Sequence, residues 1–205
     1  MGKLVMVSLV VMLAALPAPA RADQAEWRIG AGGGGTVVNA RTGGADGTGI
    51  GYEAHGRLGH GVSNTLELGL IGGYTHAPDL AFASASVGGQ TGTLFADMST
   101  VTISVEFRWT PGLGLARAFE RTSPYVAARA GAALLVRTSQ QLFTETGLLI
   151  LAPADDLRLI PFAAAAIGVE HRFGDHLFLP GEFTASLVGD VRLMGLTAEA
   201  GWAWY

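Results

Sequence analysis

The segment STVTISVEFRW, residues 99–109, alternates strictly between two kinds of side chain. Large apolar residues occupy every second position from Val101 to Trp109, and Thr, Ser, Glu and Arg occupy the positions between them. A period of two is the pattern of a β-strand whose two faces lie in different environments. Two structures produce it: a soluble antiparallel sheet with its polar face in water, and a membrane barrel with its apolar face in lipid.

The same alternation recurs along the chain, and no segment of comparable length shows a helical period. Near the C-terminus, for example, Leu196, Trp202 and Trp204 alternate with Thr197 and Glu199. We therefore predict an all-β fold, an eight-stranded antiparallel up-and-down barrel. Its expected strands are residues 26–35, 50–59, 65–75, 99–109, 125–137, 159–173, 177–188 and the C-terminal stretch from 195.

The first 22 residues differ in composition from the rest. Lys3 precedes an apolar run at 4–16, and Ala20-Arg21-Ala22 follows it. This order is typical of a cleaved secretory signal peptide. The alternative is a membrane anchor, but the run of 13 residues is shorter than the roughly 20 that a spanning helix needs. We expect a signal peptide at 1–22 and one barrel domain at 23–205.

Charge and cysteine content exclude several classes of protein. Lys3 is the only lysine, and it leaves with Arg21 in the signal peptide, so 11 arginines face 17 acidic residues in the remainder. A nucleic-acid partner requires a basic surface, and this composition excludes one. The chain has no cysteine, so an exported protein of this sequence must be stable without disulfides.

The expected strands leave connections of unequal length. HGVSN (60–64) and GDH (174–176) are tight, whereas long loops are expected at 39–48, for some twenty residues from 76, and for a similar length from 138. Short turns at one rim and long loops at the other are typical of outer-membrane barrels. Two connections depart from this rule: the link at 110–124, interpreted as containing a short helix, and the very short one at 189–190. Alternation across the glycines in 80–98 predicts that this hairpin continues beyond the membrane.

Each predicted strand carries charge on the face opposite its large apolar side chains. A lipid-facing arginine at mid-bilayer costs roughly 2–4 kcal/mol, so this sorting favours a charged interior. Five arginines and six glutamates nearly balance, as a narrow interior requires, because an unpaired buried charge is far more costly than a paired one. The predicted interior ion-pair network comprises Arg28, Glu53, Arg57, Glu67, Glu106, Arg108, Arg129, Glu170, Arg172, Glu182 and Glu199.

A soluble lipocalin-like barrel would sort its residues the opposite way, with charges outside and large apolar residues inside. The polar faces contain no lysine, and the apolar faces end in aromatic residues, as membrane-interface girdles do. These features favour a membrane barrel, and a soluble periplasmic ligand-binding barrel is the alternative. The predicted interface aromatics are Trp27, Tyr52, Tyr74, Trp109, Phe173, Trp202 and Trp204.

With these strands, loops and an aromatic-terminated last strand, the chain resembles the small outer-membrane barrels of Gram-negative bacteria, the OmpA-type and opacity-type transmembrane domains. The resemblance implies a place in the outer membrane, contact with its lipid, and recognition of the last strand by the barrel-assembly machinery. For that recognition it points to Trp202, Trp204 and Tyr205, although Tyr205 is out of phase with the two tryptophans.

Motifs for cofactor chemistry are weak. Gly30, Gly32 and Gly35 match the dinucleotide-binding spacing, but no helical pattern follows to hold a pyrophosphate, so we predict no cofactor. The glycines are better explained by closure of the first strand against the last. The five histidines (His55, His60, His76, His171 and His176) lack the spacing of metal ligands, and His55 is expected to join the interior network.

Function is predicted at the level of class. An eight-stranded barrel is just wide enough for its own side chains, which disfavours a wide pore. We predict a non-enzymatic barrel that displays acidic loops for surface interaction, adhesion or envelope integrity. The apolar run 148–151 is interpreted as a cover over the barrel mouth or as a contact for a partner. The alternative is a lipid-modifying enzyme that uses His76, Asp79, Ser84 and Asp97. The acidic loop residues Asp46, Asp79, Asp97, Glu145, Asp155, Asp156 and Asp190 outnumber Arg41, Arg158 and Arg192.

Overall fold

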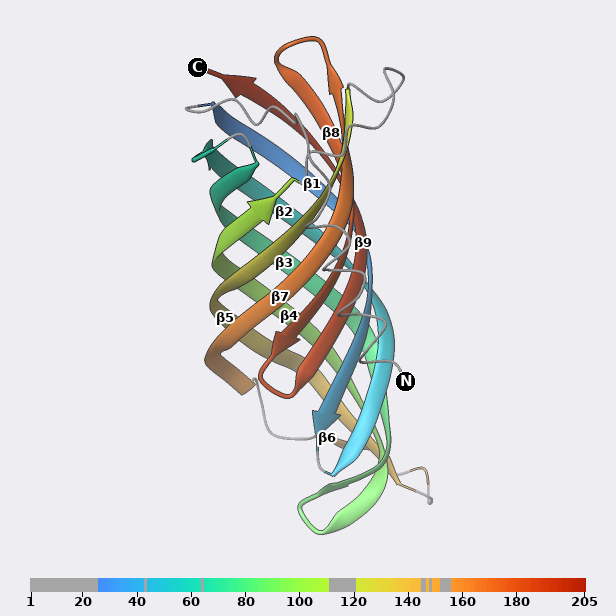
Figure 1. Cartoon of the computed structure of the whole chain (residues 1–205). Coiled ribbons are helices and arrows are strands. Elements are labelled where there is room, and N and C mark those ends of the chain that lie inside the picture. The colour runs from blue at the N-terminus through green and yellow to red at the C-terminus, as the bar shows by residue number, and fades with distance from the viewer. Residues whose placement is uncertain are drawn as a thin grey trace, which may run out of the picture.

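The computed structural model describes residues 26–42, 44–63, 65–110, 121–144, 147, 149–151 and 156–205. Within these ranges the chain forms nine antiparallel strands, of which eight close into a ring (Figure 1). None of the described residues form a helix long and apolar enough to cross a bilayer. The strands are β1 (Trp27–Thr42), β2 (Ala45–Gly61), β3 (Leu66–Val87), β4 (Gln90–Trp109), β5 (Thr122–Thr144), β6 (Leu149–Leu151), β7 (Asp156–Phe173), β8 (Leu177–Val188) and β9 (Val191–Trp204).

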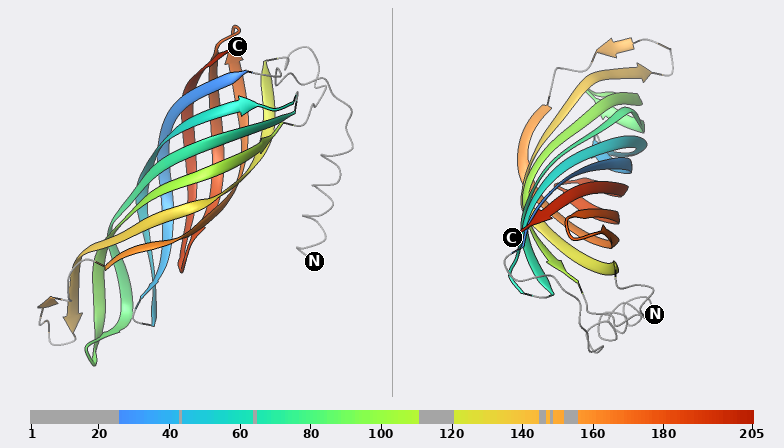
Figure 2. Two further views of the ribbon diagram at one scale, coloured as in Figure 1. Left: turned by 90° about the vertical axis from the view of Figure 1, so that its left-hand side faces the viewer. Right: turned by 90° about the horizontal axis from the view of Figure 1, so that it is seen from above.

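The barrel closes between its first and last strands, because β1 pairs with both β2 and β9. The stagger of the barrel follows from the residues that pair across each ladder. When these pairs are followed once around the ring from Ile29 of β1, they lead back to β1 at Asn39, ten residues further along. Such a stagger is typical of strands tilted by roughly 35–45° from the barrel axis. Figure 2 shows that the strands run obliquely around the barrel. We call the end that holds Trp27 and Trp204 the terminal rim, and the opposite end the hairpin rim.

Three connections expected to be long loops are largely strand. The last residue of β1, Thr42, pairs with the first residue of β2, Ala45, and β5 continues to Thr144, so the expected loops at 39–48 and from 138 are wrong in extent. β3 and β4 meet across Gly88 and Gly89, whose φ angles of 60° and 81° suit a tight hairpin turn. This confirms the predicted hairpin at 80–98. The ladders continue beyond the apolar band because paired strands satisfy each other's backbone N–H and C=O groups, whether lipid or water surrounds them. The predicted helix at 110–124 lies mostly outside the described residues.

The outer surface of the ring is apolar. Ile50, Ile103 and Leu196 are 77%, 66% and 68% exposed, and they lie on the same outward faces as Trp27 and Phe183. The neighbouring inward positions carry the charges, and Arg28, Glu67 and Glu106 are buried. A soluble barrel would show the reverse distribution. The fold therefore presents an apolar band to its surroundings, as a transmembrane barrel does.

The interior has two zones that differ in polarity. Near the terminal rim it is lined by charged and hydroxyl side chains, whereas near the hairpin rim it is filled by an apolar cluster that includes Leu80, Phe82, Leu94, Met98 and Leu142, all at most 1% exposed. We expected a polar interior along the whole barrel, and the apolar zone corrects that expectation. Near the hairpin rim, β3 breaks the alternation at residues 78–79 and 83–84, where its pairing with β4 shifts register. Between the two zones, the apolar and polar residue types exchange faces.

Candidate functional site

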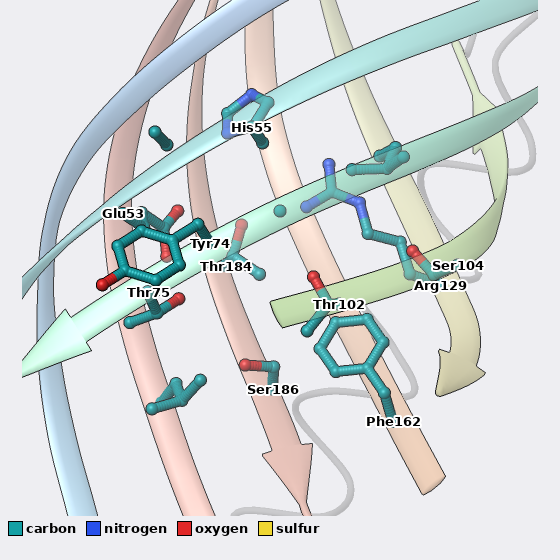
Figure 3. A pocket seen from close by; sticks show the side chains of 14 residues that line it. Glu53, His55, Tyr74, Thr75, Thr102, Ser104, Arg129, Phe162, Thr184 and Ser186 are labelled. Carbon is teal, nitrogen blue, oxygen red and sulfur yellow. The ribbon is translucent and has the colours of Figure 1, made fainter. Parts of the chain in front are cut away.

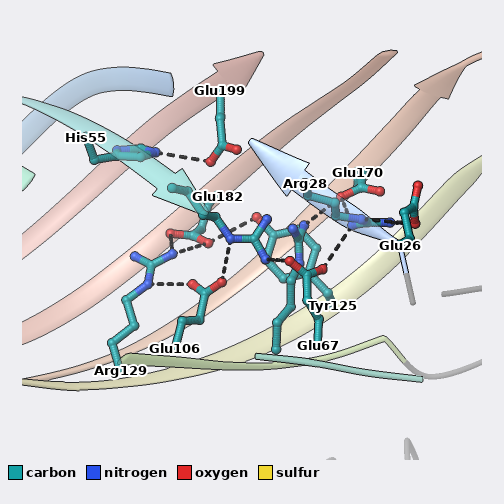
Figure 4. Close-up of polar contacts among 12 residues, drawn as sticks. Glu26, Arg28, His55, Glu67, Glu106, Tyr125, Arg129, Glu170, Glu182 and Glu199 are labelled. Carbon is teal, nitrogen blue, oxygen red and sulfur yellow. Dashed lines mark hydrogen bonds and ion pairs between the residues drawn. The ribbon is translucent and has the colours of Figure 1, made fainter. Parts of the chain in front are cut away.

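A network of ion pairs fills the polar zone, as Figure 4 shows. Arg28, near the start of β1, bonds to Glu26, Glu67 and Glu170 at 3.1–3.3 Å. Glu26 also receives Arg172 of β7 at 2.9 Å. A single β1 guanidinium thus joins carboxylates from β3 and β7, which lie on opposite sides of it around the ring.

Ion pairs that join different strands continue on β2, β4, β5 and β8. Arg57 of β2 pairs with Glu67 and with Glu106 of β4, the latter at 2.7 Å. Arg129 of β5 pairs with Glu106 and with Glu182 of β8, each at 2.7 Å. Glu67 and Glu106 therefore each receive two guanidinium groups and Glu182 receives one, while the Arg57 and Arg129 guanidiniums each reach two strands.

Tyr125 and Arg108 close the network into a circuit. The Tyr125 hydroxyl donates to Glu182 at 3.0 Å, and the Arg108 guanidinium carbon lies 3.5 Å from the centre of the Tyr125 ring. Arg108 in turn pairs with Glu170 at 3.0 Å, which leads back to Arg28. Charge-assisted bonds of this kind are stronger than neutral ones, and the stacked guanidinium adds a cation–π contact.

Glu199 and His55 form a separate pair at 3.3 Å. They lie on β9 and β2, with β1 between them, so the glutamate side chain crosses the inner face of β1. A Cβ atom at Gly30 would lie 1.9 Å from Glu199 Oε1, and one at Gly32 would lie 2.3 Å from the Ala198 carbonyl oxygen. The glycines of β1 therefore make room for a side chain that ties the last strand to the second.

The structure places all eleven predicted network residues on the inner face, at least partly buried. Ten of them take part in the ion pairs described above or in the Arg172–Glu170 pair, and the side chain of Glu53 lines a neighbouring cavity. The sequence reading missed Glu26 and Tyr125. The period-two alternation could have identified both residues, because Glu26 is two positions from Arg28 and Tyr125 is four positions from Arg129, so each pair shares a face.

A cavity lies where the two zones meet, because its lining includes Arg129 of the ion pairs as well as Leu193 and Phe162 of the apolar cluster. Figure 3 shows the side chains that line it. It has a volume of about 50 Å³, enough for a few water molecules. Glu53, His55 and Arg129 contribute polar groups, and hydroxyls come from Thr75, Thr102, Ser104, Thr184 and Ser186. Phe162, Ile71 and Leu193 belong to its apolar lining.

The predicted interface aromatics lie on the outer surface at two heights. Trp27, Phe173, Trp202 and Trp204 are exposed at the terminal rim, where Trp109 is partly buried. Tyr52 and Tyr74 lie further along β2 and β3, with their ring centroids 6.3 Å apart. The last residue, Tyr205, is 68% exposed. A role for these side chains at the lipid interface and in assembly stays a prediction.

Most histidines pack against these aromatics rather than against each other. His60 lies 4.5 Å from the Trp27 ring, His171 lies 4.5 Å from Phe173, and His176 stacks on Trp202 at 5.1 Å. In the part of the chain that the structure describes, no three His, Asp or Glu side chains gather as a metal-ligand set.

The residues of the enzymatic alternative are only partly brought together. His76 Nδ1 lies 2.9 Å from Ser99 Oγ, not beside Ser84. The backbone N–H of Asp79 donates to Asp97 Oδ1 at 2.9 Å. The serine beside His76 is therefore Ser99 of β4 and not the predicted Ser84, because the β3–β4 ladder pairs His76 with Ser99.

A closed ring of tilted antiparallel strands, an apolar outer band and a charged interior define the class of transmembrane β-barrels. Residues 6–203 match the family model described as outer membrane protein beta-barrel domain. The chain belongs to that family. No curated protein sequence matches it significantly.

Two solved structures show the same fold. Neisserial surface protein A (NspA) has a TM-score of 0.56 at 14% identity, with 86% of this chain and 96% of that one covered. OprG from Pseudomonas aeruginosa has a TM-score of 0.52 at 12% identity, with 92% and 100% covered. At these identities the likeness concerns the fold alone.

Proposed function

We propose that this barrel is a non-enzymatic anchor that displays its hairpins at the cell surface for surface interaction, adhesion or envelope integrity. The observation that carries the proposal is the filled interior. Ion pairs occupy the half near the terminal rim, and the apolar cluster that contains Leu80, Phe82 and Leu94 occupies the other. Such a barrel has no room for a wide channel, so its accessible chemistry lies on the hairpins.

The hairpins support a surface role in their extent and charge. β3 and β4 are 22 and 20 residues long, against 12 for β8, so the barrel wall is much taller on one side. Asp46 is 84% exposed at the β1–β2 hairpin and lies 3.6 Å from Arg41. Asp190 lies at the turn after β8. A partner with complementary basic groups would suit such a surface.

One experiment tests this function. Cells that express the protein are fractionated, and membrane samples are run on a gel with and without boiling. The purified protein is then placed in a planar bilayer. We expect it in the outer membrane, with a mobility change on boiling and no steady conductance. A soluble periplasmic protein without a mobility change, or a stable open pore, would contradict the proposal.

The enzymatic alternative rests on the His76–Ser99 contact. An imidazole within hydrogen-bond reach of a serine hydroxyl is the first requirement of a serine nucleophile, and both residues lie where the apolar outer band ends. No acidic side chain is seen bonded to His76 among the described residues, and the Tyr74 hydroxyl also lies 3.4 Å from Ser99. Mass spectrometry of lipid A from cells that express the wild-type protein or the Ser99→Ala variant distinguishes the enzyme from the non-enzymatic anchor. Acyl loss only with wild type would favour the enzyme.

A further inference from the structure

A small basic patch lies on the outer surface at the hairpin rim, over β9, β1 and β2. The register sets Asn39 of β1 beside both Arg192 of β9 and Thr48 of β2. Arg41 lies two positions beyond Asn39 on the same outward face of β1, so it is a diagonal neighbour of Arg192. Long side chains at diagonal positions are within reach of each other. We call Asn39, Arg41, Thr48 and Arg192 the rim patch.

The rim patch lies where the apolar band ends. On each of its three strands, the next outward residue toward the terminal rim is apolar and exposed, and these residues are Val37, Ile50 and Met194. The outer surface therefore changes from polar to apolar at the same height on neighbouring strands. Because lipid head groups begin where the hydrocarbon ends, the rim patch lies at the height of the head groups.

The charges of the rim patch are only weakly neutralised by the protein. Arg192 is exposed and has no ion-pair partner among the described residues. The Arg41 Nε lies 3.6 Å from Asp46 Oδ1, but the two side chains are 67% and 84% exposed, and such a surface pair contributes little. Two guanidiniums and one carboxylate leave one net positive charge. The surface thus holds a cation on its lipid-facing side, where an anionic group complements it.

Uncharged groups add donors to the rim patch. The Thr48 hydroxyl donates to Asn39 Oδ1 at 2.6 Å, which leaves the N–H groups of the Asn39 side chain as donors. From inside the barrel, Arg137 donates to the Thr42 hydroxyl at 3.2 Å and to the Arg41 carbonyl at 3.4 Å. This end of β1 is therefore held although its pairing with β9 stops at Asn39. A donor set held in place loses less freedom when a ligand binds.

We propose that the rim patch binds the phosphate of one anionic lipid of the surrounding bilayer, whose acyl chains lie along the apolar band beside Ile50 and Met194. A guanidinium donates paired hydrogen bonds to phosphate oxygens, and the Asn39 amide supplies a further donor. The net charge of the patch complements the single negative charge of a phosphodiester. This inference goes beyond the surface function proposed above, because it concerns the side of the barrel that faces lipid.

The test uses the full barrel refolded in a non-ionic detergent. Native mass spectrometry measures bound lipid while phosphatidylglycerol or phosphatidylcholine with the same acyl chains is added. Both carry a phosphate, but choline neutralises it in the second. We expect wild type to bind the first phosphatidylglycerol about tenfold more tightly than phosphatidylcholine. The double variant Arg41→Gln/Arg192→Gln should bind the two alike. Arg121→Gln, which changes an exposed arginine at the terminal rim, should keep the preference.

Circular dichroism of each variant establishes that the barrel is folded, so that lost binding reports on the site. Inorganic phosphate in excess serves as a competitor and should not displace the lipid, because it has no acyl chains to place on the apolar band. Three outcomes overturn the proposal: equal binding of the two lipids by wild type, a preference that survives in the double variant, and an equal loss in Arg121→Gln. Displacement by inorganic phosphate would overturn the assignment to a lipid.

Discussion

At the scale of single residues, Glu106 has an environment that tolerates little change. It is 1% exposed and lies 2.7 Å from both Arg57 and Arg129. Breaking a buried ion pair by removal of one partner costs about 3–5 kcal/mol, because the other charge stays buried. Glu106→Gln should therefore lower the urea midpoint of the barrel in lipid vesicles. Asp46→Asn should change the free energy of unfolding by less than about 0.5 kcal/mol. Equal midpoints for the two variants would contradict a stabilising network.

The glycines of β1 yield a graded prediction. A methyl group at Gly32 would meet the β9 backbone at the Ala198 carbonyl, 2.3 Å away, whereas one at Gly30 meets the movable end of Glu199. Gly35 has nothing within 4 Å. We expect Gly32→Ala to destabilise the barrel most, Gly30→Ala less, and Gly35→Ala least. Urea unfolding of the three variants measures the order, and a Gly35→Ala variant as unstable as Gly32→Ala would refute the close-approach explanation.

At the scale of the element, β4 shows where the environment changes along a strand. Leu94, Ala96 and Met98 point inward and are buried, and from Thr100 to Arg108 the inward positions are polar. The outward positions change in the opposite sense, from polar at Asp97 and Ser99 to apolar from Val101 onward. A strand that leaves lipid for water must exchange its polar and apolar faces, since the outer solvent changes while the interior stays shielded. We infer that the hydrocarbon boundary lies near Ser99.

This boundary predicts unequal costs for one substitution at two outward positions. Ile103→Arg places a charge in the apolar band and should cost roughly 2–4 kcal/mol of folding free energy in vesicles. Thr91→Arg, on the exposed part of the hairpin, should cost less than about 0.5 kcal/mol. Folding equilibria in the same lipid give both values. Similar losses at the two sites would place the boundary elsewhere.

At the scale of the whole molecule, the two rims should face different compartments. The chain has no cysteine, so single cysteines report accessibility without background. We expect Thr91→Cys, at the hairpin rim, to react with a membrane-impermeant maleimide in intact cells. Asp175→Cys, in the turn between β7 and β8, should react only after the outer membrane is broken. Labelling of Asp175→Cys in intact cells, with Thr91→Cys protected, would reverse the orientation.

The alternation in the sequence determined much of this protein. A period of two fixed which side chains share a face, and the cost of charge in lipid indicated which face turns inward. The closed barrel and its family followed from that, as did the inward direction of the eleven network residues. These features could be predicted because the alternation of side chains between two faces is a local property of an extended chain.

Other features depended on tertiary structure. The stagger of ten residues decides that Arg28 meets Glu67 and Glu170, and that Glu199 crosses β1 to reach His55. Ladder register likewise decides that His76 meets Ser99. Neither the stagger nor the strand ends can be read from alternation, which is the same at every register and continues beyond the membrane. Contacts across the interior join residues far apart in the chain, and only the closed ring brings them together.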